Sequence, residues 1–365
     1  MLKTRYPVNI SKSYLFKLSV PLFFANLAIP LVSIIDTGLM GHLSTSKYLA
    51  ATSISTSVLA VIFWSFGFLR MGTVGLISQA LGKSDYREIS KIIIRNLTIA
   101  FIISLFIILS KNLIIYYIDV FFQTSEETKK LIAQYISVRV FSAPAELVIY
   151  VLVGFYLGIQ KTRVSSLLII IFSSLNILFS SYFVLIMNLK IYGVAIGTVL
   201  SAYITIIIFL TYTYYFIHSN FQVLPKFKKI FDEKKIFQLL NINFNIFIRT
   251  LFLTFSFFWV TYQGSKLGED YLAVNTILMQ FIILAAFFLD AYAFSTEGIV
   301  GYSIGRRNKT SFLQVVKNSI QVSFFTALIL SILYLIFFKE VINVITDIEI
   351  LRFISYKHFI WIIII

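Results

Sequence analysis

The fold is decided by residues 48–82, YLAATSISTSVLAVIFWSFGFLRMGTVGLISQALG, in which Arg70 is the one charged residue. An α-helix needs roughly 20 predominantly apolar residues to cross the hydrocarbon core of a bilayer. The stretch therefore predicts a membrane-spanning helix over about 48–72.

A second stretch, residues 271–305, repeats the first at a constant offset of 223 residues. Seven positions are identical in the two copies, namely Tyr48, Leu49, Ala50, Ile54, Thr73, Gly75 and Gly82 with Tyr271, Leu272, Ala273, Ile277, Thr296, Gly298 and Gly305. Both copies end in glycine followed by a basic residue, Lys83 or Arg306. An even number of predicted spans separates the copies, so the two halves have parallel topology. Such halves are typical of carriers that bind substrate between them.

The rest of the chain has the same apolar character. Of its 365 residues, 59% are hydrophobic and 13% are charged, whereas soluble proteins are nearer half and a quarter. Because backbone amides in lipid must be satisfied internally, we expect an all-α polytopic membrane protein. The predicted spans are 14–40, 48–72, 90–110, 132–158, 164–187, 192–216, 237–263, 271–294 and 315–338, with a tenth from about 353 to 365.

The repeat also predicts the domain organisation. The first six helices form an N-lobe over 1–220, a basic cytoplasmic linker covers 221–236, and a C-lobe with helices seven to ten covers 237–365. The sequence ends at the counterpart of Ser142, inside the tenth helix. We therefore expect two six-helix lobes of which the second is incomplete, with about ten of twelve helices present.

The net charge of +15 is distributed as a topology signal. Every second loop is basic and the alternate loops are more acidic, as the positive-inside rule requires when the N-terminus is cytoplasmic. The basic loops contain Lys83, Arg87, Lys91, Lys161, Arg163, Lys226, Lys228, Lys229, Lys234, Lys235, Arg306, Arg307 and Lys309. This pattern favours a multi-pass protein of a bacterial inner membrane over a nucleic-acid-binding protein.

Catalytic and nucleotide-binding signals are missing from the sequence. It contains no cysteine, and its histidines, at 42, 218 and 358, lack the spacing of metal ligands. Gly82-Lys83-Ser84 resembles the end of a phosphate loop, but Ile77 stands where the motif needs glycine. We expect neither an enzyme nor a nucleotide-dependent pump.

Several longer segments resemble the MATE (multidrug and toxic compound extrusion) transporters of the DinF-like branch. They are PLFFANLAIPLVSIIDTGLMGHLS from residue 21, FGFLRMGTVGLISQALGK from 66, APAELVIYVLVGFYLGIQKTR from 143, NILFSSYFVLIMNLKIYGVAIGTVLS from 176 and the repeat copy from 271. The resemblance covers residues 10–365. It implies two six-helix lobes around a V-shaped cavity, and export of organic compounds in exchange for protons or sodium ions.

The resemblance also implies a cation site in the N-lobe. The family's Asp on the first helix, Asn and further Asp on the fifth, and Thr on the sixth fall on Asp36, Asn176, Ser180 and Thr198. Ser180 departs from the pattern, which leaves the choice between proton and sodium open. Asn176 and Ser180 share a helix face, being four residues apart, and oxygen ligands suit a hard cation. The alternative is that Asp36 caps its helix or faces water near the interface.

Other polar residues in the spans have two interpretations each. Pro21 and Pro30 form a hinge in the helix of Asp36, or are static prolines of a kind common in membrane helices. Arg249, Asp290 and Glu297 predict a C-lobe polar network, with Arg249 bracing Asp290, while Glu297 alternatively reaches the interface.

Two further charged features are interpreted as structural rather than functional. Arg139 and Glu146 repeat the seven-residue spacing of Asp290 and Glu297 and suggest a similar brace. Arg70 is expected to snorkel towards the interface.

We therefore expect a monomeric secondary antiporter that exports amphipathic, cationic compounds. Its partners are a small-molecule substrate and the bilayer, and it needs no cofactor beyond the coupling H⁺ or Na⁺, with no metal site beyond sodium at Asp36. The alternatives are a flippase for lipid-linked oligosaccharides, a membrane-embedded glycosyltransferase, and a truncated product that transports nothing.

Overall fold

The computed structural model describes residues 11–43, 45–122, 124–221, 230 and 232–364, and every regular element among them is a helix. The elements are α1 (Lys12–Gly41), α2 (Ser46–Ser65), α3 (Phe68–Gly82), α4 (Tyr86–Leu109), α5 (Lys111–Phe121), α6 (Glu126–Arg139), η1 (Val140–Ser142), α7 (Ala143–Gly158), α8 (Thr162–Ser181), η2 (Tyr182–Ile186), α9 (Lys190–Phe221), α10 (Glu233–Lys266), α11 (Glu269–Gly305), α12 (Lys309–Ile345), α13 (Glu349–His358) and α14 (Ile360–Ile364). The all-α prediction is confirmed.

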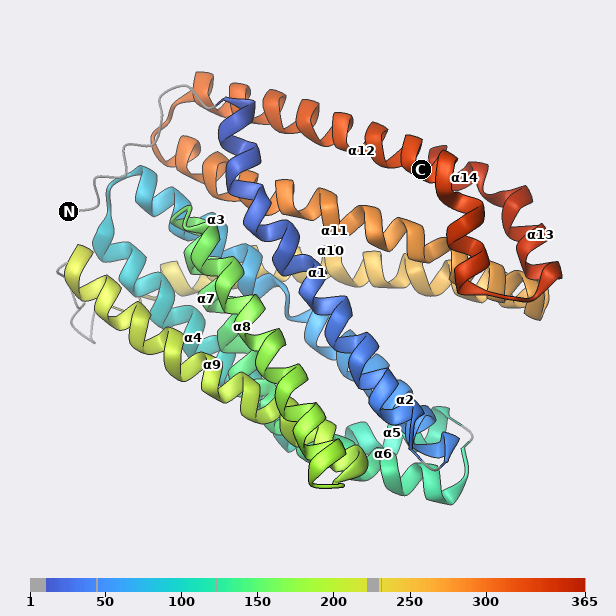
Figure 1. Ribbon diagram of the computed structural model, residues 1–365. Helices are drawn as coiled ribbons and strands as arrows, with labels where there is room; N and C mark the ends of the chain where they lie inside the picture. Colours follow the sequence, from blue (N-terminus) through green and yellow to red (C-terminus); the bar gives the residue numbers. More distant parts are fainter. Residues whose placement is uncertain (1–10, 44, 123, 222–229, 231, 365) are drawn as a thin grey trace.

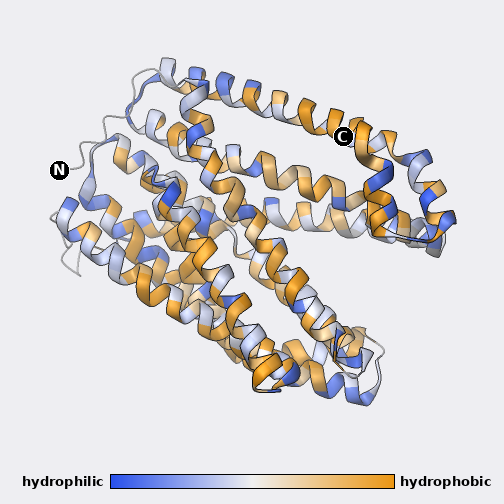
Figure 2. Ribbon diagram, in the orientation of Figure 1, coloured by the Kyte–Doolittle hydropathy of each residue, from blue (hydrophilic) through white to orange (hydrophobic). Residues whose placement is uncertain are grey.

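Nine stretches within the described residues are long and apolar enough to cross a membrane. They are 12–41, 46–82, 86–109, 126–158, 162–186, 190–221, 235–264, 273–305 and 309–345, and each contains most or all of one predicted span. Figure 2 shows that hydrophobic residues predominate along these helices. Many of their apolar side chains are exposed, and Leu109 and Ile336 are more than half exposed. Such a surface is stable in lipid and unstable in water.

Several predicted boundaries differ from the observed helices. Helix α11 continues past the predicted end at 294 to Gly305, and the tenth span predicted from 353 falls on two separate helices, α13 and α14. The second span continues past residue 72 to Gly82 and is interrupted at Phe66 and Gly67, where α2 ends and α3 begins. Helix α10 begins at Glu233, inside the predicted linker, because Asp232 caps it by accepting the Lys235 backbone N–H at 3.3 Å. Most of that linker, residues 222–229 and 231, lies outside the described residues.

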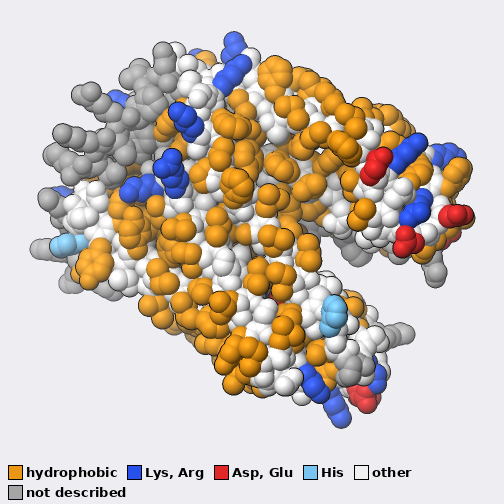
Figure 3. Space-filling view, viewed as in Figure 1, with side chains coloured by type: hydrophobic (Ala, Val, Ile, Leu, Met, Phe, Trp, Pro, Cys, Tyr) orange, Lys and Arg blue, Asp and Glu red, His pale blue; other side chains and the backbone are white. Residues whose placement is uncertain are grey.

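The helices form two groups that meet at one end of the molecule and diverge towards the other. Figure 1 shows α1–α9 in one arm and α10–α14 in the second, with α3 and α11 in contact where the arms join. Hydrogen bonds link the arms as well. Ser19 Oγ lies 2.8 Å from Ser295 Oγ, and Asn26 Nδ2 donates to the Phe287 carbonyl at 2.9 Å. Figure 3 shows a deep hollow between the diverging ends.

The sequence repeat recurs in the turn that follows each copy. Ser84 and Arg307, 223 positions apart, both have positive φ, at 58° and 55°. The next residues, Asp85 and Asn308, both cap the following helix through side-chain oxygens at 3.0 and 2.9 Å from the N–H groups of Glu88 and Ser311. The repeat is therefore structural, because the same turn is built twice from different residues.

Helix α1 is continuous from Lys12 to Gly41, and both Pro21 and Pro30 lie inside it. Each proline lacks an N–H and leaves the carbonyl four residues earlier without its helical partner. The predicted hinge positions are thus weak points within an unbroken helix.

Candidate functional site

Asp36 lies on α1, one and a half turns before the helix ends at Gly41. Its side chain is partly buried, and Oδ1 is buried without a hydrogen-bond partner among the described residues. The groups that act on the carboxylate are the Ser180 hydroxyl and the more distant Arg139 guanidinium. A buried carboxylate oxygen without a partner is costly.

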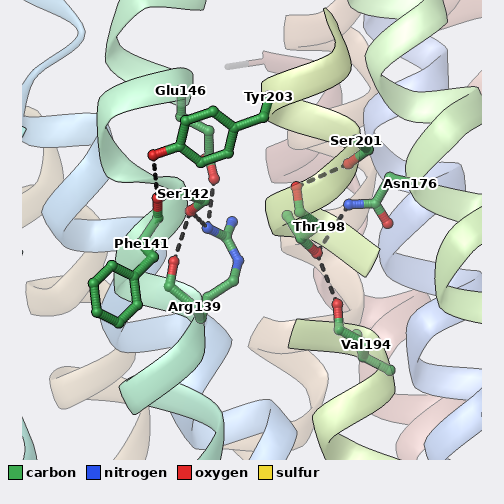
Figure 4. Close-up of polar contacts among 9 residues, drawn as sticks. All are labelled: Arg139, Phe141, Ser142, Glu146, Asn176, Val194, Thr198, Ser201 and Tyr203. Carbon is green, nitrogen blue, oxygen red and sulfur yellow. Dashed lines mark hydrogen bonds and ion pairs between the residues drawn. The ribbon is translucent and has the colours of Figure 1, made fainter. Parts of the chain in front are cut away.

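Asn176 and Thr198 join α8 to α9 beside Asp36. Asn176 Nδ2 donates to Thr198 Oγ1 at 2.9 Å, and Thr198 Oγ1 donates to the Val194 carbonyl at 3.1 Å. Ser180 Oγ donates to Asn176 Oδ1 at 3.3 Å, and Asn176, Ser180 and Thr198 are all buried. Figure 4 shows Asn176 and Thr198 pointing towards each other from the two helices. The four residues assigned by resemblance are thus brought together from three helices.

The close approach of α8 and α9 at this point depends on Gly197. A Cβ at residue 197 would lie 2.7 Å from the Ser180 backbone nitrogen and 2.8 Å from its Oγ. Glycine therefore lets Ser180 and Thr198 come within reach of one another. The Ser180 hydroxyl acts on Asp36, and the Asn176 amide and the Thr198 hydroxyl extend this polar cluster. Oxygen groups of this kind suit a proton or a small hard cation.

A second charged group lies beside this cluster, at the junction of α6 and α7. Arg139 Nη1 donates to Glu146 Oε1 and to Ser142 Oγ. Both charged side chains are 13% exposed. In Figure 4, Arg139 and Glu146 lie on one side of Thr198 of α9, and Asn176 lies on the other side. Tyr203 of α9 donates to the Phe141 carbonyl at 3.0 Å. Sequence reasoning noted the spacing of this pair and did not connect it to Asp36.

The predicted C-lobe network is arranged differently from the expectation. Glu297 pairs with Arg70, with Arg70 Nη1 3.3 Å from Glu297 Oε2, and no ion pair joins Arg249 to Asp290 in the described part of the chain. Arg70 also lies over the Phe294 ring at 3.9 Å. The predictions of an Arg249–Asp290 brace and of a snorkelling Arg70 are therefore wrong. The reason is that α3 packs against α11, which brings Arg70 to Glu297 across the join between the arms.

Asp290 and Arg249 lie close enough to Arg70 and Glu297 to interact electrostatically without direct contact. Asp290 and Arg249 are exposed in the part of the structure described, whereas Arg70 is largely buried, with a side chain 12% exposed. Asn243 on α10 is buried nearby, opposite Gly72 of α3, and its amide atoms have no partner among the described residues. The polar groups between the arms thus centre on Arg70 rather than on Arg249.

The helical architecture, the paired arms and the polar cluster inside one arm define a membrane transport protein. The MatE family model matches residues 21–182 and 246–365, and the chain belongs to this family. Among its relatives, MepA of Staphylococcus aureus is named a multidrug export protein, and one solved structural neighbour is described as a multidrug resistance MATE family transporter.

Individual relatives agree with this assignment. The chain is 28% identical over 351 residues to DNA damage-inducible protein F of Escherichia coli, covering 96% of this chain and 76% of the relative. It is 21% identical over 331 residues to a probable multidrug resistance protein, NorM, of Bacillus cereus, covering 89% and 73%. A crystal structure of MATE in the straight conformation superposes with a TM-score of 0.87 at 18% identity, covering 97% of this chain and 80% of the other.

Proposed function

We propose that this protein is a secondary antiporter that exports amphipathic, cationic organic compounds in exchange for protons or sodium ions. The observation that carries the proposal is the buried, unpartnered Oδ1 of Asp36 among the oxygens and amides of Asn176, Ser180 and Thr198. A carboxylate in that environment gains most from binding a cation, since an unpaired charge away from water is costly.

Substrate and coupling ion would compete for the same carboxylate. A cationic compound in the hollow between the arms and a cation at Asp36 each neutralise one negative charge, so each weakens binding of the other. A relative's name supports drug-like substrates in general, because NorM of Bacillus cereus is named as a probable multidrug resistance protein.

The proposed setting is a bacterial cytoplasmic membrane with a cytoplasmic N-terminus, and the protein acts as a monomer. In support, the basic turns at Lys83, Lys161 and Arg306 lie at the end where the arms meet. By the positive-inside rule this end faces the cytoplasm, and the hollow then opens outwards.

The test is transport of a cationic dye by the purified protein in liposomes, under an imposed proton gradient and separately under a sodium gradient. Wild type is compared with Asp36→Asn and with Asp119→Asn, an acidic residue whose side chain is 48% exposed at the end of α5. We expect gradient-driven transport in wild type and Asp119→Asn, and its loss in Asp36→Asn.

Two outcomes would reject the proposal. Equal transport by wild type and Asp36→Asn would remove Asp36 from the coupling mechanism. No gradient-driven transport by any variant, together with transfer of a lipid-linked sugar between leaflets, would instead establish a flippase.

A further inference from the structure

The ion pair of Arg139 and Glu146 occupies an irregular point in the chain. Helix α6 ends at Arg139, η1 covers Val140–Ser142, and α7 starts at Ala143 with Pro144 in its first turn. Pro144 lacks an N–H, and the turn before it is a tightened 3₁₀ turn. Across this turn Arg139 Nη1 donates to Glu146 and to Ser142. Ser142 Oγ in turn donates to the Arg139 carbonyl at 2.7 Å, which fixes the turn.

This pair is buried in the same helical arm as Asp36. The Arg139 guanidinium also lies 5.3 Å from the centre of the Phe63 ring on α2. Helix α9 packs against α6 and η1 and also against α8, so it connects the pair to the Asn176–Thr198 cluster. Tyr135, which is 1% exposed, interacts electrostatically with both Arg139 and Asp36. The two groups are therefore parts of one polar region.

The charges of this region do not balance. The ionisable groups that act on one another here are Asp36, Tyr135, Arg139, Glu146 and Tyr150, and Arg70 acts on Tyr150 from α3. Arg70 is already paired with Glu297. The region thus contains two carboxylates, Asp36 and Glu146, and one guanidinium, Arg139, which is paired with Glu146. A single negative charge is left in a low-dielectric interior, where an unbalanced charge is costly.

We propose that Arg139 is a positioning residue shared by Glu146 and Asp36, and that the resulting charge deficit of one makes this site take up one monovalent cation per transport cycle. The inference rests on the proposed antiport function and specifies its stoichiometry. Arg139 contacts neither substrate nor cation. It acts by holding Glu146 neutralised, so that the remaining negative charge resides on Asp36, whose Oδ1 has no hydrogen-bond partner in the described part of the chain.

The competing interpretation is that Arg139 and Glu146 only brace the junction of α6 and α7. A brace affects the amount of folded protein and its thermal stability. It does not change how tightly Asp36 binds the driving cation, because no charge would be shared. Cation affinity therefore separates the two interpretations.

The experiment measures dye transport in liposomes as a function of driving-cation concentration, for protons or for sodium, together with the thermal unfolding of each variant. In Glu146→Gln, Asp36 and Arg139 balance each other, so the apparent affinity for the cation should fall about tenfold. In Arg139→Gln two carboxylates are left, so the affinity should rise about tenfold. The double variant again has one negative charge and should return to within about threefold of wild type.

Two controls accompany these variants. Glu126→Gln removes an 81% exposed acid from α6 and should bind the cation as wild type does. Arg139→Lys keeps the positive charge but loses the forked geometry, so it should preserve cation affinity even where its melting temperature falls. If a single variant does not fold, the double variant and Arg139→Lys still test the inference. The cation affinity of each should follow its net charge and not the geometry of the lost pair.

The transport reversal potential of wild type should correspond to one cation per cycle. Wild-type cation affinity in Glu146→Gln and Arg139→Gln, with lower melting temperatures alone, would establish a brace and overturn the inference, as would two cations per cycle. The Asp36→Asn variant distinguishes a failure of the proposed function from a failure of this inference. If that variant transports normally, the proposed function itself fails, whereas an inactive Asp36→Asn beside an unaltered Glu146→Gln rejects the inference alone.

Discussion

Gly82 and Gly305 lie against each other where α3 crosses α11, although 223 residues separate them in the chain. A Cβ on Gly82 would lie 3.0 Å from the Gly305 Cα, and Gly305 itself packs against the Gln79 backbone. Ser78 and Gly301, also equivalent in the repeat, meet in the same way. Equivalent residues in contact place the pseudo-symmetry axis between these two helices.

The first prediction concerns this crossing. Gly82→Ala would place a methyl group against backbone atoms of α11, so we expect the free energy of unfolding to fall by about 1–3 kcal/mol. Gly75→Ala is the matched control on the same helix, because a Cβ there meets nothing within 4 Å. It should be neutral or stabilising by up to about 1 kcal/mol. Thermal unfolding in detergent measures both, and equal melting temperatures would show that the crossing is loosely packed.

The second prediction concerns the ion pair between the arms. Arg70→Glu or Glu297→Arg would place like charges together, so the arms should separate where they now join and their far ends should approach. The chain has no cysteine, so spin labels on cysteines introduced at Ser46 and Val344 report the distance between the far ends. The single variants should shorten that distance, and the double exchange should restore it. An unchanged distance distribution in the single variants would assign the pair no role in holding the arms.

The third prediction concerns the packing of α8 on α9. Gly197→Ala would push Ser180 and Thr198 apart and break the 2.9 Å bond between Asn176 and Thr198. We expect gradient-driven transport to fall at least tenfold and stability to fall by about 1–3 kcal/mol. Gly38→Ala is the control, since a Cβ there meets nothing within 4 Å. Normal transport by Gly197→Ala would mean that the α8–α9 bond is dispensable.

The fourth prediction tests the repeat through its helix caps. Asp85→Ala and Asn308→Ala each remove one side-chain bond to a helix N-terminus, so each should cost about 1 kcal/mol of stability. Thr45 precedes α2 without a side-chain capping bond, and Thr45→Ala should cost much less. Chemical unfolding of the three variants compares them directly. Unequal losses at Asp85 and Asn308 would contradict the equivalence of the two turns, and an equal loss at Thr45 would show that the capping bonds contribute no stability.

Much of the fold was predictable because hydropathy is a local property. A long apolar run must become a helix in lipid, wherever the rest of the chain lies. Each of the first nine predicted spans overlaps a membrane-length helix in the described residues, whereas the tenth falls on the short helices α13 and α14. The equivalent ends of the two repeat copies were also visible in the sequence, as Gly82-Lys83 and Gly305-Arg306. The break at Phe66 and Gly67 was not predicted, since no proline or charged residue stands at those positions of the apolar stretch.

The sequence identified the residues of the candidate site but not the side chains that surround them. Asp36, Asn176, Ser180 and Thr198 were identified by resemblance, and the structure gathers them from α1, α8 and α9. Their roles in coupling stay a prediction. Arg139 and Glu146 carried a visible signal, a seven-residue spacing in an apolar span, but spacing alone does not say which neighbouring helix faces the pair.

The sequence by itself determined the membrane class, the helices and the internal repeat, because each follows from residues adjacent in the chain or from comparison of one half with the other. The tertiary structure alone decided the partners of the buried charges. Arg70 lies 227 positions from Glu297, and nothing in the spacing of Arg249 and Asp290 excluded the pair that did not form. A buried charge takes the partner that helix packing brings within about 4 Å, and packing depends on small residues such as Gly82 and Gly305 in distant parts of the chain.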